Sequence, residues 1–276
     1  PALPGAPPEV RVFDVAVVSH AASGQEFLRA SARSRLEPRQ RPALVFHGDE
    51  YGQLAWAEKE SQLLHEHCYP QAETYENEGS PATPEVVLSL LGGRAAAPAS
   101  LVQLSCHGVA GPDPTTSALV LAGPGREDGE PGEEHLTLTA LLETPHDGEA
   151  YRSRGPVVVC SACETDLTTR DHDEALTVTS VLVHRLASDA VGTRWGVDDI
   201  DSVVLTLVLH DRIAAGVAPP DALRAAQRWM VAAPGDRPPV PALEGFPRRF
   251  WDRSFDESDV WAAFVHHGNP SGGVRQ

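Results

Sequence analysis

Short apolar runs alternate with segments of helical spacing along most of the chain. The expected strands are residues 10–18, 43–46, 73–75, 101–106, 157–160 and 188–195. The expected helices are residues 25–35, 54–67, 84–91, 175–186, 202–215 and 220–231, the third of them capped by Thr83. Repeated strand–helix alternation is typical of a mostly parallel sheet with helices on both faces. We therefore predict an α/β fold.

Two segments interrupt this alternation. Residues 123–134 are acidic and rich in glycine, and residues 233–247 are rich in proline. Both compositions are typical of surface loops or insertions, and neither segment is long enough to form a domain. The predicted organisation is an N-terminal linker with a strand–helix approach over residues 1–42, one domain over 43–268 and a flexible tail over 269–276.

Composition and charge narrow the possible partners. The chain has 276 residues, and 22 Lys and Arg against 39 Asp and Glu give a net charge of −17, which repels phosphate backbones. No stretch approaches the roughly 18 uncharged apolar residues that a membrane span requires. Its 4 cysteines are too few for a secreted disulfide scaffold, and no signal peptide opens the chain. We therefore expect a soluble, cytoplasmic protein that binds neither nucleic acid nor membrane.

An imidazole and a thiol follow two of the predicted strands. His107 comes directly after strand 101–106, and Cys163 comes shortly after strand 157–160. In parallel sheets, functional groups gather beyond the carboxyl ends of the strands. Caspases place a histidine roughly 50 residues before the nucleophilic cysteine, and the spacing here is 56 residues. The pattern indicates a His–Cys pair at one edge of the sheet.

Several sequence blocks around this pair resemble one family. They are LVQLSCHG (101–108), VVVCSACET (157–165), GTRWGVDD (192–199) and DALRAAQRWM (221–230). Their order is that of CHAT domains, which are caspase-like peptidases often fused to tetratricopeptide repeats. The first strand–helix junction (47–64) and the closing strand (260–268) are also similar. Two positions depart from the family pattern: Asp166 stands where glycine is common, and Cys106 stands where a small or apolar residue is usual.

The resemblance implies a caspase-like three-layer fold and a cysteine endopeptidase that needs no cofactor or metal. Cys163 would attack the scissile carbonyl as a thiolate, and His107 would donate a proton to the leaving amine. The backbone N–H groups of Gly108 and Cys163 would hold the oxyanion. Family analogy further implies a protein substrate, latency until an activating partner or a fused repeat domain orders the loops, and a role in bacterial defence or signalling.

Substrate choice follows from charge at the expected specificity pocket. In caspase-like folds this pocket is built from the loops after the first strand and after the strand that follows the nucleophile. Those positions hold Asp49 and the pair Asp198 and Asp199. Because caspases use arginines there to bind aspartate, carboxylates would select Arg or Lys. We predict cleavage after a basic residue.

Other interpretations are weaker. A catalytically inactive CHAT-like docking module is the main alternative, and a doubly wound nucleotide-binding domain ranks last because no Gly-rich phosphate motif follows an early strand. Cys106 and Cys160 are expected in the core. The run from His65 to Cys68 suggests zinc, but residues 65 and 67 lie on different helix faces, which favours a solvated helix end.

Overall fold

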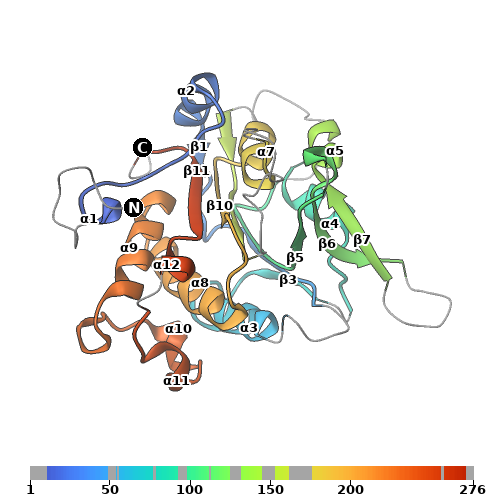
Figure 1. Ribbon diagram of the computed structural model, residues 1–276. Coiled ribbons are helices and arrows are strands. Elements are labelled where there is room, and N and C mark those ends of the chain that lie inside the picture. The colour runs from blue at the N-terminus through green and yellow to red at the C-terminus, as the bar shows by residue number, and fades with distance from the viewer. Residues whose placement is uncertain are drawn as a thin grey trace.

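A computed structural model describes residues 11–48, 54, 56–76, 79–92, 98–111, 113–124, 132–144, 153–161, 176–255 and 258–271. A six-stranded sheet lies at its centre, in the order β11-β10-β9-β4-β2-β3 (Figure 1). The strands are β2 (Pro42–Phe46), β3 (Glu73–Tyr75), β4 (Leu101–Ser105), β9 (Val157–Cys160), β10 (Asp189–Thr193) and β11 (Phe264–Gly268). All neighbours are parallel except β10 and β11. The predicted mostly parallel α/β fold is confirmed.

Helices cover both faces of this sheet. One face packs against α1 (Val12–Val15), α3 (Ala57–His67), α8 (Asp199–Ala214), α9 (Pro219–Val231), α10 (Pro241–Glu244), α11 (Arg248–Trp251) and α12 (Ser258–Trp261). The opposite side of the sheet is covered by α2 (Gly24–Ala32), α4 (Pro84–Leu90), α5 (Leu138–Glu143) and α7 (Val178–Arg185) (Figure 1). Successive residues of a strand point to opposite faces, so Leu101 joins the first core and Val102 the second. The three layers expected from the resemblance are present.

Local signals in the sequence locate most of these elements within a few residues. Thr83 caps α4 as predicted, because its hydroxyl accepts a hydrogen bond of 3.3 Å from the backbone N–H of Val86. Thr177 caps α7 in the same way through the N–H of Ser180. The apolar character of β9 and of the first residues of β4 follows from burial on both faces, which is usual for central parallel strands.

The predicted strand over residues 10–18 is wrong. Residues 12–15 form the short helix α1, and residues 16–19 have no regular structure. Phe13 is the buried side chain of α1, whereas Val15 and Val18 are exposed. A strand requires a partner edge as well as β-branched residues, and the chain pairs with β11 just after this segment, through an isolated bridge between His20 and His267.

The acidic segment at 123–134 is flanked by strands and is only partly a loop. Strand β6 (Ala118–Gly123) pairs antiparallel with β7 (Gly132–Thr137), and β5 (His107–Val109) pairs with the other edge of β6. This three-stranded sheet stands beside the central sheet (Figure 1). Residues 125–131 lie outside the described part of the chain. The Pro-rich segment 233–247 contains a turn of 3-10 helix, Pro234–Asp236, and helix α10.

The two remaining strands, β1 (Ser34–Arg35) and β8 (Arg154–Gly155), form a separate small sheet. They lie parallel, and a further turn of 3-10 helix, Pro114–Thr116, precedes β6. The position of β1 matters because its Arg35 contacts the buried Asp189 at the amino end of β10, with two nitrogen–oxygen distances of 2.8 Å. Strand β1 thereby anchors the N-terminal region to the amino edge of the central sheet.

Candidate active site

The predicted catalytic histidine lies where the chain passes from one sheet to the other. β4 ends at Ser105, and His107 begins β5, opposite Val120 of β6. The side chain of His107 is half-buried, and Gly108 follows it opposite Leu119. The imidazole is therefore at the carboxyl edge of the central sheet, as the sequence predicts.

The carboxyl end of β9 lies directly beside that of β4. Leu104 pairs with Cys160, and the backbone N–H of Ser161 donates to the carbonyl of Leu104 at 2.9 Å. The predicted nucleophile, Cys163, follows Ser161 by two residues and lies outside the described residues, as does Asp49. The structure thus brings together the two strand ends that carry the predicted pair.

The three cysteines within the described residues are poor nucleophiles. Cys68, Cys106 and Cys160 are buried free thiols. Burial raises the pKa of Cys68 and of Cys160 to about 12, and it raises that of Cys106 further. Because the thiolate is the reactive form, these side chains are inert near neutral pH. The expected core positions of Cys106 and Cys160 are confirmed, and Cys163 is the remaining candidate.

The two predicted specificity carboxylates open helix α8. Asp198 is exposed and caps the helix by accepting a hydrogen bond from the N–H of Ile200 at 3.0 Å. Asp199 is half-buried and accepts from the N–H of Trp56 at 2.9 Å, which joins the start of α8 to the start of α3. Both carboxylates therefore have visible structural roles, and their part in substrate selection stays a prediction.

Electrostatics connects Asp199 with the predicted catalytic residue. Burial raises the pKa of Asp199, and the N–H of Trp56 opposes that effect. The charge of Asp198 raises this pKa further, whereas the charge of His107 lowers it. Asp199 and His107 are thus close enough for their charges to act on each other, although 92 residues separate them in the sequence.

A buried carboxyl group that sequence reasoning missed lies beneath the two strand ends. Glu60 of α3 is 1% exposed and accepts hydrogen bonds from Gln103, Ser105 and Ser161. Burial raises its pKa to about 7. Hydrogen bonds from Ser105, Ser161 and Gln103 lower this pKa, whereas the charge of Asp199 raises it further. A signal existed in the sequence, because Glu60 shares the helical spacing of the buried residues of α3.

The hydrogen bonds around Glu60 continue into α8. His210 is fully buried, and its Nε2 lies 2.7 Å from Oε1 of Gln103 while its Nδ1 lies 2.9 Å from the hydroxyl of Tyr69. Burial lowers the pKa of His210 to about 3, so the imidazole is neutral. Nε2–H therefore donates to Gln103, and Nδ1 accepts from Tyr69. Thr206 also contacts Ser161, with 3.1 Å between the two hydroxyl oxygens.

Stability should report the charge state of Glu60. The native protein keeps a proton on Glu60 up to about pH 7, whereas the unfolded chain releases it near the usual pKa of 4.5. The native state binds more protons in that window, so Glu60 makes the protein less stable as pH rises through it. At about 1.4 kcal/mol per pH unit, the stability gain of Glu60→Gln over wild type should grow by roughly 3 kcal/mol across the window.

Urea unfolding of both proteins at a series of pH values measures this difference. His210 acts with the opposite sign, because its lowered pKa makes the protein lose stability as pH falls from 6.5 to about 3. That contribution is present in wild type and in Glu60→Gln, so it cancels in the comparison. A stability difference that is constant between pH 4.5 and 7 would contradict a raised pKa for Glu60.

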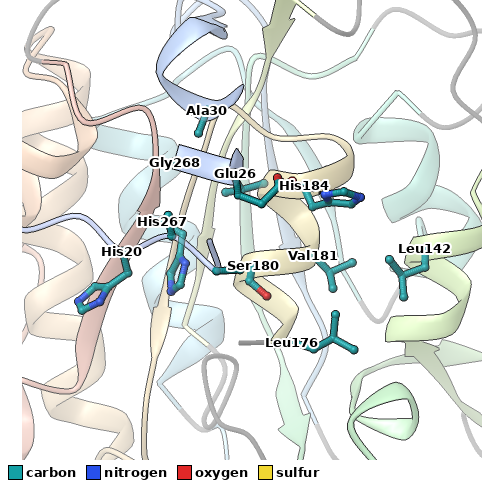
Figure 2. Close-up of a pocket in the computed structure, with 13 residues that line it drawn as sticks. His20, Glu26, Ala30, Leu142, Leu176, Ser180, Val181, His184, His267 and Gly268 are labelled. Carbon is teal, nitrogen blue, oxygen red and sulfur yellow. Dashed lines mark ion pairs between the residues drawn. The ribbon is translucent and has the colours of Figure 1, made fainter. Parts of the chain in front are cut away.

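A cavity of about 180 Å³ lies elsewhere, between α2, α7 and edge strand β11 (Figure 2). Glu26 and His184 meet on its rim, with 3.1 Å between Oε2 and Nδ1. Gly268, which also lines the cavity, pairs with Asp189 at the amino end of β10. The cavity therefore lies away from the strand ends that carry His107 and Ser161.

The described residues show neither a metal cluster nor a membrane-spanning helix. Among them, no group of three or more His, Cys, Asp or Glu side chains is arranged to hold a metal ion. In the segment from His65 to Cys68, Nε2 of His67 lies 4.0 Å from Oε2 of Glu66 at the end of α3. No helix in the described ranges is long and apolar enough to cross a membrane.

The family follows from comparison with known sequences. The CHAT domain family matches residues 12–269. The chain belongs to the CHAT family. The match spans most of the chain, including the ends of β4 and β9 at the candidate site and the closing strand β11. No curated protein matches this CHAT domain significantly.

Solved structures with a similar fold include a cysteine proteinase. A complex of the pro- and mature domains of RgpB from Porphyromonas gingivalis aligns with a TM-score of 0.51 at 11% identity, over 91% of this chain and 53% of that one. The Arg-specific cysteine proteinase gingipain R (RGPB) aligns with a TM-score of 0.47 at 10% identity, over 91% and 51%. This CHAT domain spans about half the length of these structures. Its fold is that of caspase-like cysteine proteinases.

Proposed function

We propose that this CHAT domain is a cysteine endopeptidase in which His107 and Cys163 form the catalytic pair. The observation that carries the proposal is the adjacency of the ends of β4 and β9, where Leu104 pairs with Cys160. His107 follows one end and Cys163 follows the other. A thiol with an imidazole beside it is the arrangement that produces a reactive thiolate. The three buried cysteines offer no competing nucleophile.

The chemistry assigns one task to each group. The thiolate of Cys163 attacks the scissile carbonyl, and a C–S bond forms as the carbonyl oxygen becomes an oxyanion. The imidazolium of His107 then gives its proton to the leaving amine as the C–N bond breaks. Water hydrolyses the thioester that remains and releases the second product. Backbone N–H groups of Gly108 and Cys163 are proposed as donors to the oxyanion.

We further propose a protein substrate cut after Arg or Lys. Asp198 and Asp199 stand at the start of α8, and the charge of His107 lowers the pKa of Asp199. A carboxylate in the substrate pocket attracts a basic side chain and repels an acidic one. Asp49 completes the proposed set, and it lies outside the described residues. We also propose latency, as a low basal activity that rises when an activating partner orders the loops.

A peptide library varied at the residue before the cut tests this function. We expect cleavage after Arg or Lys by the wild-type chain and none by Cys163→Ala. Asp199→Asn retains an oxygen for the N–H of Trp56, and Asp198→Asn retains a helix cap, so each removes charge alone. We expect kcat/KM for basic peptides to fall roughly tenfold in Asp199→Asn and less in the exposed Asp198→Asn.

The possible outcomes separate the parts of the proposal. Cysteine-dependent cutting after an acidic residue would retain the enzyme and refute the basic specificity. A peptidyl electrophile that labels Cys163 without turnover of any peptide would indicate a latent enzyme. If neither cleavage nor Cys163-dependent labelling occurs, the endopeptidase assignment is wrong and a docking role takes its place.

A further inference from the structure

A polar layer lies between the central sheet and helices α3 and α8. On this face, β4 presents Leu101 and then Gln103 and Ser105, so it changes from apolar to polar toward its carboxyl end. β9 does the same, because the apolar Val159 is followed on this face by Ser161. Gln103 and Ser105 are fully buried and Ser161 is half-buried, which makes their hydrogen-bond partners energetically important.

Glu60 is the common acceptor in this layer. Its Oε1 lies 2.7 Å from Oγ of Ser105, 2.8 Å from Nε2 of Gln103 and 3.1 Å from Oγ of Ser161. Its Oε2 lies 3.3 Å from Oγ of Ser161. Ser105 and Ser161 also accept from Nε2 of Gln103, at 3.1 and 2.7 Å. One carboxyl group thus joins both strand ends to α3.

The position of the two serines gives this arrangement a consequence for the site. Ser105 precedes His107 by two residues, and Ser161 precedes Cys163 by two residues. Hydrogen bonds from both serines to one oxygen, at 2.7 and 3.1 Å, limit how far the two strand ends can move relative to each other. A displacement of about 1 Å between reacting groups can reduce a rate about 100-fold.

We propose that Glu60 is a positioning residue, which ties the ends of β4 and β9 together and thereby sets the geometry between His107 and Cys163. The inference rests on the proposed peptidase function, since positioning matters only if these two residues react together. Glu60 itself is buried beneath the strand ends and contacts Gln103 and the two serines. It acts through them and does not contact the substrate.

The charge of Glu60 strengthens the tether. A carboxylate accepts hydrogen bonds roughly twice as strongly as a neutral oxygen. Of the titratable groups on the packed elements, Asp199 of α8 disfavours ionisation of Glu60, and His210 of α8 stays neutral. β4 and the described end of β9 contribute only neutral hydrogen-bond donors, which favour ionisation. Protonation near pH 7 therefore weakens the tether without removing it.

Steady-state cleavage of the best library peptide by the full chain tests the proposal. Glu60→Ala removes the acceptor, and we expect kcat to fall about 100-fold with KM within about twofold of wild type. Tyr69→Phe is the matched control, because it removes the hydroxyl at the far end of the same network and leaves Glu60 and both serines in place. Its kcat should stay within about twofold of wild type.

A pH comparison separates positioning from a merely structural role. Glu60→Gln retains an acceptor oxygen but has no charge, so it resembles protonated Glu60. We expect wild type to exceed Glu60→Gln about fivefold in kcat at pH 8, and this ratio should approach one at pH 6 as wild-type Glu60 takes up a proton. Any pH dependence of the chemical step itself is common to both proteins and cancels in the ratio.

Each outcome bears on one claim. If wild type cleaves through Cys163 and Glu60→Ala has wild-type kcat, the positioning role is overturned while the peptidase stands. If Glu60→Ala does not fold, Glu60→Gln and Ser161→Ala decide: unchanged kcat in both, with a ratio that does not vary with pH, overturns the role. If wild type shows neither Cys163-dependent cleavage nor alkylation of Cys163 by iodoacetamide, the proposed function fails and the positioning role fails with it.

Discussion

Replacing His107 with alanine is expected to lower kcat/KM by roughly 100- to 10,000-fold, the range that positioned general acids contribute. The imidazole is suited to this task because its ordinary pKa lies near neutral pH, so it can hold a proton and release it to the leaving amine. His107 is half-buried at the junction of β4 and β5, so its truncation opens no large hole in either core. The loss should therefore be in chemistry, with the unfolding midpoint close to that of wild type.

Peptide cleavage by His107→Ala, measured beside two reference variants, checks this result. His135 of β7 occupies the same register row of the three-stranded sheet, since Val120 of β6 pairs with both histidines. Its side chain is exposed, and His135→Ala should cleave as wild type does. Cys163→Ala sets the background rate. Wild-type kcat/KM in His107→Ala would show that the catalytic acid lies elsewhere.

Replacing Asp189 with alanine is expected to destabilise the fold by about 3–5 kcal/mol. The Asp189 side chain is 0% exposed and that of its partner Arg35 is 5% exposed. Two hydrogen bonds of 2.8 Å hold the guanidinium on the carboxylate, and Nε2 of His266 lies 2.9 Å from Oδ1. Burial alone would raise the pKa of Asp189, but His266 and Arg35 outweigh it and hold that pKa below its usual value. Removal of Asp189 leaves a buried cation without its counterion.

Urea unfolding at neutral pH measures this loss, and a second ion pair of the same kind provides the control. Glu73 of β3 pairs with Arg41 at 3.1 Å, and their side chains are 44% and 40% exposed. Exposed pairs contribute about 0–1 kcal/mol, so Glu73→Ala should be nearly as stable as wild type. A loss below about 1 kcal/mol in Asp189→Ala would show that the buried pair is not essential for stability.

Asp189 and His107 lie at opposite ends of the strands of one sheet. Asp189 begins β10 and pairs with the last residue of β11, whereas His107 and Ser161 follow the carboxyl ends of β4 and β9. Asp189→Ala should therefore change stability with little effect on kcat of the folded protein. His107→Ala should do the reverse. This separation is expected for parallel sheets, in which functional groups lie at the carboxyl ends of the strands and residues at the amino ends stabilise the fold.

The sequence by itself determined the class of fold and the two strand ends that the candidate pair follows. The central parallel strands are buried on both faces, so β9 is apolar throughout and β4 begins with apolar residues that stand out from their surroundings. The end of such a run marks the carboxyl edge of the sheet, and His107 and Cys163 follow two of these ends. Local caps such as Thr83 were likewise predictable, because the interaction spans only three residues.

Only the tertiary structure decided how residues distant in sequence meet. Glu60 and Ser161 are 101 positions apart, yet their side chains share a hydrogen bond because α3 packs against β2 and β4, and β9 lies beside β4. The β-branched segment at 12–18 is not a strand, because strand formation depends on a free edge that pattern alone does not reveal. Local spacing records which face a residue occupies, and the partner on that face is chosen by the packing of the whole chain.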